Sequence, residues 1–319
     1  LGRFDDAVKS FKKSIKISSN FAEAHNNYGN LLADLGRRDD SIKSFKKAIE
    51  INPNFAEAYN NLGNVFKSLN KIKDSVQSYE MAIEINPNFA EAYNNLGNLL
   101  TMDSKLLNQA VKCFEKAVEI NPDFAIAHNN LGNAFKDLNY LDEALKSYER
   151  AFDIESSLDN VLGNVLSTKM NSCNWDGLAE LLFDAKQRIV NNESVVEPFT
   201  LLGLIDDPAI QRKATELRVR AHHPFNNSLP KLNVYSEHIK IRIAYFSADF
   251  REHPLSYLTA ELYELHNRDH FEVHAFSFGP DTQDEMNLRI KAGVDHFHNV
   301  ESMSLKEMAL FVRSLKIDI

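Results

Sequence analysis

The chain has 319 residues, of which 44% are hydrophobic and 25% are charged, and its formal net charge is −9. This length allows two or three domains. The acidic balance argues against a nucleic-acid-binding protein, because such proteins normally carry a basic face. No apolar run approaches the roughly 20 residues that a transmembrane helix needs. The two cysteines make no disulfide framework, which favours a reducing, cytoplasmic compartment.

The first half of the chain is built from one repeated unit. The unit begins at Phe21 and returns at Phe55, Phe89 and Phe124, in steps of 34, 34 and 35 residues. A period of 34 residues with two amphipathic segments is typical of tetratricopeptide repeats. Proline follows asparagine at 52–53, 86–87 and 121–122 and should end the second helix there. We therefore predict an α-solenoid over 1–157, with a partial repeat at 1–20 and full repeats at 21–54, 55–88, 89–123 and 124–157.

Small and aromatic residues recur at fixed places within the unit. Each first helix carries an alanine and then a glycine, and each second helix carries an aromatic residue three positions before an alanine. Small residues let two helices approach closely, and the aromatic ring should fill the space beside them. The third repeat has one extra residue near 101–108, which should lengthen the turn between its helices.

Two columns of asparagine recur on the first helix of every full repeat. The two columns are three residues apart, which puts them on one helical face. In tetratricopeptide repeats that face lines the groove. Amides donate and accept hydrogen bonds, so these columns could bind the backbone of an extended peptide. The alternative is that asparagine is solvated there or braces the neighbouring repeat. The candidate peptide-binding residues are Asn27, Asn61, Asn95 and Asn130, with Asn30, Asn64, Asn98 and Asn133.

The period fails after residue 157, and residues 158–238 are expected to form a helical cap and linker. The segment to Val190 is expected to be helical. A further helix is predicted from Pro208 to about His222, with Asp207 as its N-cap. Residues 224–238 hold two prolines with several Asn and Ser, which is typical of a linker.

Residues 239–319 predict a different kind of fold. Ile239–Ser247 is rich in β-branched and aromatic residues and predicts a buried strand. Strands at 271–278 and 296–300 are expected to alternate with helices at 254–265, 284–292 and 304–315, and Ile317–Ile319 resembles a strand just begun. Such alternation predicts a parallel, doubly wound sheet. Since both ends fall inside expected elements, the chain is expected to be a fragment of a longer protein.

The turn after the first expected strand, residues 247–254, carries acid–base groups. Ligands of open α/β sheets bind beyond the carboxyl ends of the strands, and a histidine there can exchange a proton near neutral pH. The alternative is that Asp249 and His253 only cap the turn and the helix. No G-x-G-x-x-G follows the strand, which argues against dinucleotide binding. No metal site is expected, because the chain has two cysteines and no third ligand at usual spacing beside His296 and His298.

The order of these segments resembles the protein O-linked N-acetylglucosamine transferases of the bacterial type. In that family a strand is followed by S-x-D-F-x-x-H-P, which Ser247, Asp249, Phe250, His253 and Pro254 match. The resemblance implies a GT-B fold with two Rossmann-like lobes, of which 239–319 would be the first half of the N-terminal catalytic lobe. It also implies that His253 is an active-site residue and candidate proton acceptor, that Asp249 supports the turn, and that no metal or cofactor is used.

The resemblance further implies a protein O-glycosyltransferase. N-acetylglucosamine would pass from UDP-N-acetylglucosamine, a substrate, to Ser or Thr of proteins that the repeats present. The donor lobe would be missing from this chain, so the fragment itself is expected to be inactive. An O-fucosyltransferase of the same layout and a non-catalytic repeat scaffold stay open as alternatives. The expected partners are proteins or peptides in the solenoid groove, and neither nucleic acid nor a membrane.

Overall fold

The computed structural model describes residues 2–222, 229 and 239–319. The chain divides into two compact units, residues 1–224 and 225–319, which are described separately. The predicted linker at 224–238 lies outside the described residues, apart from Leu229. Among the described residues, no helix combines the length and the apolar character that crossing a bilayer would require.

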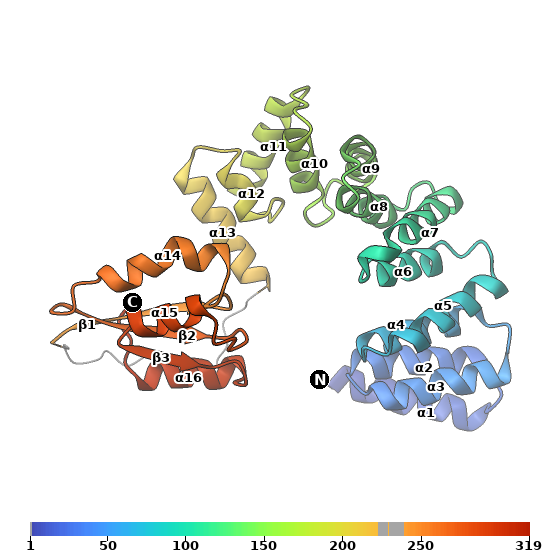
Figure 1. Ribbon diagram of the computed structural model, residues 1–319. Helices are drawn as coiled ribbons and strands as arrows, with labels where there is room; N and C mark the ends of the chain where they lie inside the picture. Colours follow the sequence, from blue (N-terminus) through green and yellow to red (C-terminus); the bar gives the residue numbers. More distant parts are fainter. Residues whose placement is uncertain (1, 223–228, 230–238) are drawn as a thin grey trace. The chain divides into compact units, whose positions relative to one another are not determined.

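The first unit begins with a solenoid of helix pairs (Figure 1). A first helix, α1 (Gly2–Ile17), packs on α2 of the first of four helix pairs, and each pair packs on the next. This arrangement confirms the predicted tetratricopeptide solenoid. The pairs are α2 (Ala22–Asp34) with α3 (Arg38–Ile51), α4 (Ala56–Ser68) with α5 (Ile72–Ile85), α6 (Ala90–Leu100) with α7 (Leu107–Ile120), and α8 (Ala125–Asp137) with α9 (Leu141–Ile154).

The glycine of each repeat lets the two helices of a pair meet over an aromatic ring. A β-carbon on Gly63 would lie 2.6 Å from the ring of Tyr79, and one on Gly29 would lie 2.7 Å from Phe45. The ring beneath each glycine is at most 1% exposed. Such contacts are closer than carbon atoms tolerate, so the repeat requires glycine here, and the predicted role of the small residues is confirmed.

The helix ends follow the predicted punctuation. Helices α3, α5 and α7 each end one residue before an asparagine–proline pair, because proline cannot continue a helix. The extra residue of the third repeat lies in a longer connection, which contains the short 3₁₀ helix η1 (Ser104–Leu106). Both expectations are confirmed.

Four further helices close the first unit. They are α10 (Val161–Asn171), α11 (Leu178–Val190), α12 (Pro198–Leu202) and α13 (Pro208–His222). Their common core includes Leu166, Ile189 and Leu201, which are fully buried. The Asp207 carboxylate accepts hydrogen bonds from the backbone N–H groups of Ala209 (3.0 Å) and Ile210 (3.2 Å), as predicted for the N-cap of α13.

The second unit is a parallel sheet with helices between its strands (Figure 1). The strands lie in the order β1 (Ile241–Ser247), β2 (Phe271–Ser277), β3 (His296–Asn299). Ile317–Ile319 runs along the other side of β1, where the carbonyl of Ile319 accepts from the N–H of Ala244 at 2.9 Å. The sheet therefore extends from β1 in both directions, as a doubly wound sheet does. The connecting helices are α14 (Pro254–Leu265), α15 (Glu285–Gly293) and α16 (Leu305–Ser314).

The burial of β1 differs from the prediction. Phe246 is 48% exposed, whereas Val273 and Phe276 of β2 are fully buried. β2 is the buried strand because it lies between β1 and β3 and carries the core residues that α14 and α15 cover. Phe246 instead lines an apolar hollow of about 450 Å³ together with residues of α16 and Ile317–Ile319.

Candidate functional site

The turn that follows β1 is anchored in the core by one ring. Phe250 is 2% exposed and meets Tyr263 edge-on, with ring centres 5.8 Å apart. The backbone N–H of Asp249 donates to Oγ of Ser247 at 3.0 Å, and the Ser256 hydroxyl donates to the carbonyl of Asp249. The turn is thus held from inside, while the side chains of Asp249 and His253 stay partly exposed.

Residues after β2 hold the turn from its other side, and sequence reasoning missed them. A β-carbon on Gly279 would lie 1.9 Å from the carbonyl oxygen of Ala248, so only glycine fits. The carboxylate of Asp284, the N-cap of α15, accepts from the N–H of Glu252 at 3.0 Å. Buried Asn287 donates its amide to the carbonyl of Phe250. Their sequence signal was weak, because a glycine and an N-cap after a strand are ordinary features of a βα connection.

His253 and Asp249 lie close together, and one ring nitrogen has two competing partners. Nδ1 of His253 accepts a hydrogen bond from the backbone N–H of Leu255 at 3.3 Å and lies 3.8 Å from the carboxylate of Asp249. Nδ1 cannot accept the backbone hydrogen bond and donate to Asp249 at the same time. In the capped state a neutral imidazole therefore carries its proton on Nε2. The same carboxylate lies 3.5 Å from the guanidinium of Arg251.

The turn also lies at the point where the strand order changes direction. β1 has β2 on one side and Ile317–Ile319 on the other. In open α/β sheets, ligands bind at such a switch point, beyond the carboxyl ends of the strands. Asp249 and His253 follow the carboxyl end of β1 and so lie where this rule places a ligand.

Side-chain hydrogen bonds join asparagines of the first column to the Asn-Asn pair of the preceding repeat, and we call this series of bonds the asparagine ladder. The amide nitrogen of Asn95 donates to the carbonyl oxygen of Asn60 in the preceding repeat at 3.0 Å. Equivalent bonds join Asn61 to Asn26 (3.1 Å), Asn130 to Asn94 (2.9 Å) and Asn164 to Asn129 (3.0 Å). Sequence reasoning named the donors up to Asn130 but not the acceptors, although the acceptor stands directly before the donor in every Asn-Asn pair.

The second asparagine column has more varied contacts. The carbonyl oxygen of Asn64 accepts from the hydroxyl of Tyr79 at 2.7 Å, and that of Asn133 accepts from Tyr148 at 2.8 Å. In the first and third full repeats the corresponding rings are Phe45 and Phe114, which cannot donate a hydrogen bond to Asn30 or Asn98. Asn30, Asn61 and Asn64 line a hollow of about 460 Å³ between the first two full repeats.

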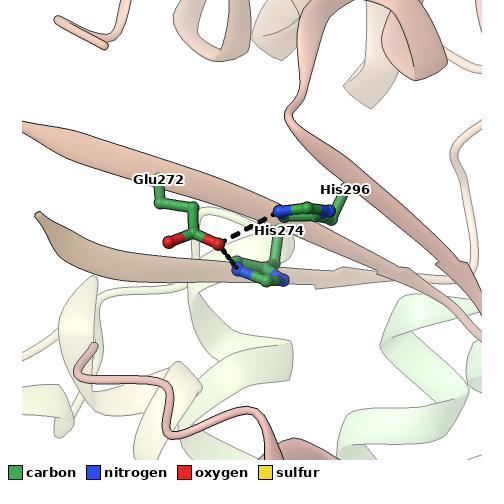
Figure 2. A group of neighbouring side chains, drawn as sticks. All are labelled: Glu272, His274 and His296. Atoms are coloured by element: carbon green, nitrogen blue, oxygen red, sulfur yellow. Dashed lines mark hydrogen bonds and ion pairs between the residues drawn. The ribbon is translucent and has the colours of Figure 1, made fainter. Parts of the chain in front are cut away.

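A histidine cluster on the sheet was missed by sequence reasoning. Figure 2 shows Glu272 with its carboxylate directed toward the rings of His274 and His296. The argument against a metal relied on the lack of a third ligand near the histidines, and this premise is wrong. Parallel pairing of β2 with β3 sets His274 beside His296, and Glu272 is two residues away on the same strand face. Burial, followed by the charge of His296, lowers the pKa of His274.

Comparison with known families matches the two parts of the architecture. A TPR repeat model matches residues 1–36, 29–70, 63–104 and 103–139, and a tetratricopeptide repeat model matches 125–157. The Glycosyl transferase family 41 model matches residues 214–310, a range that includes the Asp249–His253 turn. The chain therefore joins tetratricopeptide repeats to a segment of glycosyl transferase family 41, as the sequence resemblance implied.

Individual proteins are similar to parts of this chain. The chain is 35% identical over 80 residues to the probable UDP-N-acetylglucosamine–peptide N-acetylglucosaminyltransferase SEC of Arabidopsis thaliana, which is 25% of this chain and 8% of that relative. A mutant Thermobaculum terrenum O-GlcNAc transferase aligns at 20% identity over 93% of this chain and 44% of its own, with a TM-score of 0.34. YrrB, described as a TPR protein with an unusual peptide-binding site, aligns at 20% identity over 66% of this chain and 99% of its own, with a TM-score of 0.47.

Proposed function

We propose that the chain belongs to a protein O-glycosyltransferase that transfers N-acetylglucosamine from UDP-N-acetylglucosamine to Ser or Thr hydroxyls. The observation that carries this proposal is the succession of tetratricopeptide repeats and a family 41 segment in one chain, with the Asp249–His253 turn at the end of β1. The name of the Arabidopsis relative supports the choice of donor. The free cysteines Cys113 and Cys173 fit a cytoplasmic setting.

In the proposed reaction the acceptor hydroxyl attacks the anomeric carbon with inversion. A carbon–oxygen bond forms there, the bond to the diphosphate breaks, and the diphosphate leaves with the bonding electrons. The hydroxyl proton passes to Nε2 of His253. For this step the neutral imidazole first holds its own proton on Nδ1, so that Nδ1 donates a hydrogen bond to Asp249 in place of accepting one from Leu255. Once Nε2 has taken the hydroxyl proton, the imidazolium forms an ion pair with Asp249. Proton transfer of this kind is worth about 10²- to 10⁴-fold in rate.

We propose that the asparagine columns hold the backbone of the protein substrate. An amide has two N–H donors and a carbonyl acceptor, so each donor of the asparagine ladder keeps one N–H and its oxygen after bonding to the preceding repeat. The hollow beside Asn30, Asn61 and Asn64 leaves room for a chain to approach them. Backbone recognition of this kind would accept many sequences.

Transfer from labelled donors tests the activity. The protein expressed from the complete reading frame that contains this chain is incubated with a Ser/Thr-rich peptide and either UDP-N-acetylglucosamine or GDP-fucose. We expect transfer from the first donor and a loss of about 10²- to 10⁴-fold in His253→Ala, with His270→Ala as the exposed-histidine control. Transfer from GDP-fucose alone would identify the fucosyltransferase alternative, and transfer from neither would identify a scaffold.

Peptide binding is tested separately with substitutions outside the asparagine ladder. The double variant Asn30→Ala/Asn98→Ala removes two amides that neither brace a repeat nor accept from a tyrosine. If each loses a hydrogen bond worth about 0.5–1.5 kcal/mol, the peptide should bind about fivefold more weakly or worse in fluorescence anisotropy. Gln77→Ala, an exposed amide on α5, is the matched control. Equal affinity of both variants would contradict peptide binding by this column.

A further inference from the structure

Three potential metal ligands meet near the amino ends of β2 and β3. Oε1 of Glu272 lies 3.0 Å from Nε2 of His296 and 3.3 Å from Nε2 of His274 (Figure 2). All three ligand atoms lie within 4.8 Å of one another. Two ligands at 2.0–2.1 Å from a tetrahedral zinc ion are roughly 3.3–3.4 Å apart. The two separations from Oε1 of Glu272 are therefore close to those of a zinc site.

One of these atoms lacks a satisfactory partner in the protein. His274 is 3% exposed, and its Nε2 is buried without a hydrogen bond of acceptable geometry, although Glu272 is nearby. A buried polar atom without a partner destabilises a protein. A cation between the imidazoles and the carboxylate would satisfy this nitrogen, because coordination uses its lone pair.

Neighbouring side chains orient the potential ligands. Oε2 of Glu272 pairs with the guanidinium of Arg242 at 3.1 Å, which leaves Oε1 for a metal. Nδ1 of His274 lies 3.1 Å from Nε2 of His298, so Nδ1–H can donate there while Nε2 coordinates. The ring of His298 stacks on Phe276 with centres 4.6 Å apart. Such outer contacts fix the ring orientation and basicity of metal ligands.

We propose that Glu272, His274 and His296 bind one Zn²⁺ ion, with a water molecule in the fourth position. Imidazole and carboxylate ligands suit zinc, and His296 is 48% exposed, so the ion and its water can enter from solvent. Glu272 lies five residues before Ser277, roughly 17 Å along β2 from the carboxyl edge. The ion therefore joins β3 to β2 and takes no part in chemistry at the Asp249–His253 turn.

Zinc titration of the chelator-treated full chain tests this site, with calorimetry for affinity and cobalt absorption for coordination. We expect one zinc ion per chain and a tetrahedral cobalt spectrum, both lost in His296→Gln and Glu272→Gln. His298→Phe should bind about 10- to 100-fold more weakly. His270→Gln and His222→Gln, which change histidines outside the cluster, should bind like the parent chain.

Two results would contradict the proposal. Absence of zinc binding would show that hydrogen bonds alone hold the cluster together. Unchanged binding in His296→Gln would place the ion elsewhere. Because His296 is on the surface, its substitution should leave the fold intact, and equal melting of both proteins in chelator checks this.

Discussion

Replacing Asn95 with alanine measures what one step of the asparagine ladder contributes to stability. The change removes the donor of the 3.0 Å bond to Asn60 and leaves the carbonyl oxygen of that residue, which is 7% exposed, without this partner. An acceptor left unsatisfied in this way costs about 1–3 kcal/mol. Alanine returns up to about 0.7 kcal/mol through its higher helix propensity. The free energy of unfolding should therefore fall by about 0.5–2 kcal/mol.

The chain contains its own control for this measurement. Asn27 occupies the same place in the first full repeat and is exposed. Its carbonyl oxygen accepts from Asn26 of the same helix at 3.5 Å, and among the described residues it donates to no other repeat. Asn27→Ala should be neutral or slightly stabilising, by up to about 0.7 kcal/mol. Urea unfolding of both variants is followed by far-ultraviolet circular dichroism, and the midpoint and slope are compared.

A double variant separates the hydrogen bond from its surroundings. Asn60→Ala/Asn95→Ala removes both partners, and such paired removal can be nearly neutral. It should therefore be more stable than the sum of the single effects predicts. If Asn95→Ala is no less stable than Asn27→Ala, the asparagine ladder contributes nothing to the free energy of unfolding.

Three further outcomes are expected. Gly63→Ala forces a β-carbon against Tyr79 and should lower the free energy of unfolding by about 1–3 kcal/mol in the same urea assay; a stable variant would show that the helices can separate. Burial raises the pKa of the half-buried Cys113 thiol to about 11. Below that pH a thiol reagent should therefore label exposed Cys173 first, and equal labelling of both would contradict the partial burial of Cys113. Residues 1–319 alone should show no measurable calorimetric affinity for UDP-N-acetylglucosamine, because the resemblance places the nucleotide sugar mostly on the second lobe. Micromolar binding would show that the donor site lies within these residues.

Local patterns were sufficient to predict the repeats. A helix that recurs every 34 or 35 residues and stops before proline depends on nearby residues, so the helix pairs and the ends of α3, α5 and α7 could be predicted from the sequence. The alternation of 239–319 likewise predicted three parallel strands. The exposure of β1 could not be predicted, because burial depends on what covers a strand and not on its composition.

The contacts that join distant residues were beyond sequence reasoning. The bond between Asn95 and Asn60 exists only because neighbouring repeats stack in one register. The meeting of Glu272 with His296 depends on how two strands 24 residues apart along the chain pair side by side. Neither register has a local signal, whereas Asp249 and His253 are four residues apart and their proximity follows from one short turn.

The asparagine ladder has a direction and a built-in end. Every step runs from a donor to the acceptor of the preceding repeat, and the last donor, Asn164, is preceded by Gly163 where earlier repeats have an acceptor. A β-carbon on Gly163 would lie 3.2 Å from the Cα of Val196, so the chain itself covers this position. Duplication or loss of a whole internal repeat would keep every donor beside an acceptor. The length of the array can therefore vary by whole units during evolution, whereas its junction with α10 cannot be extended in the same way.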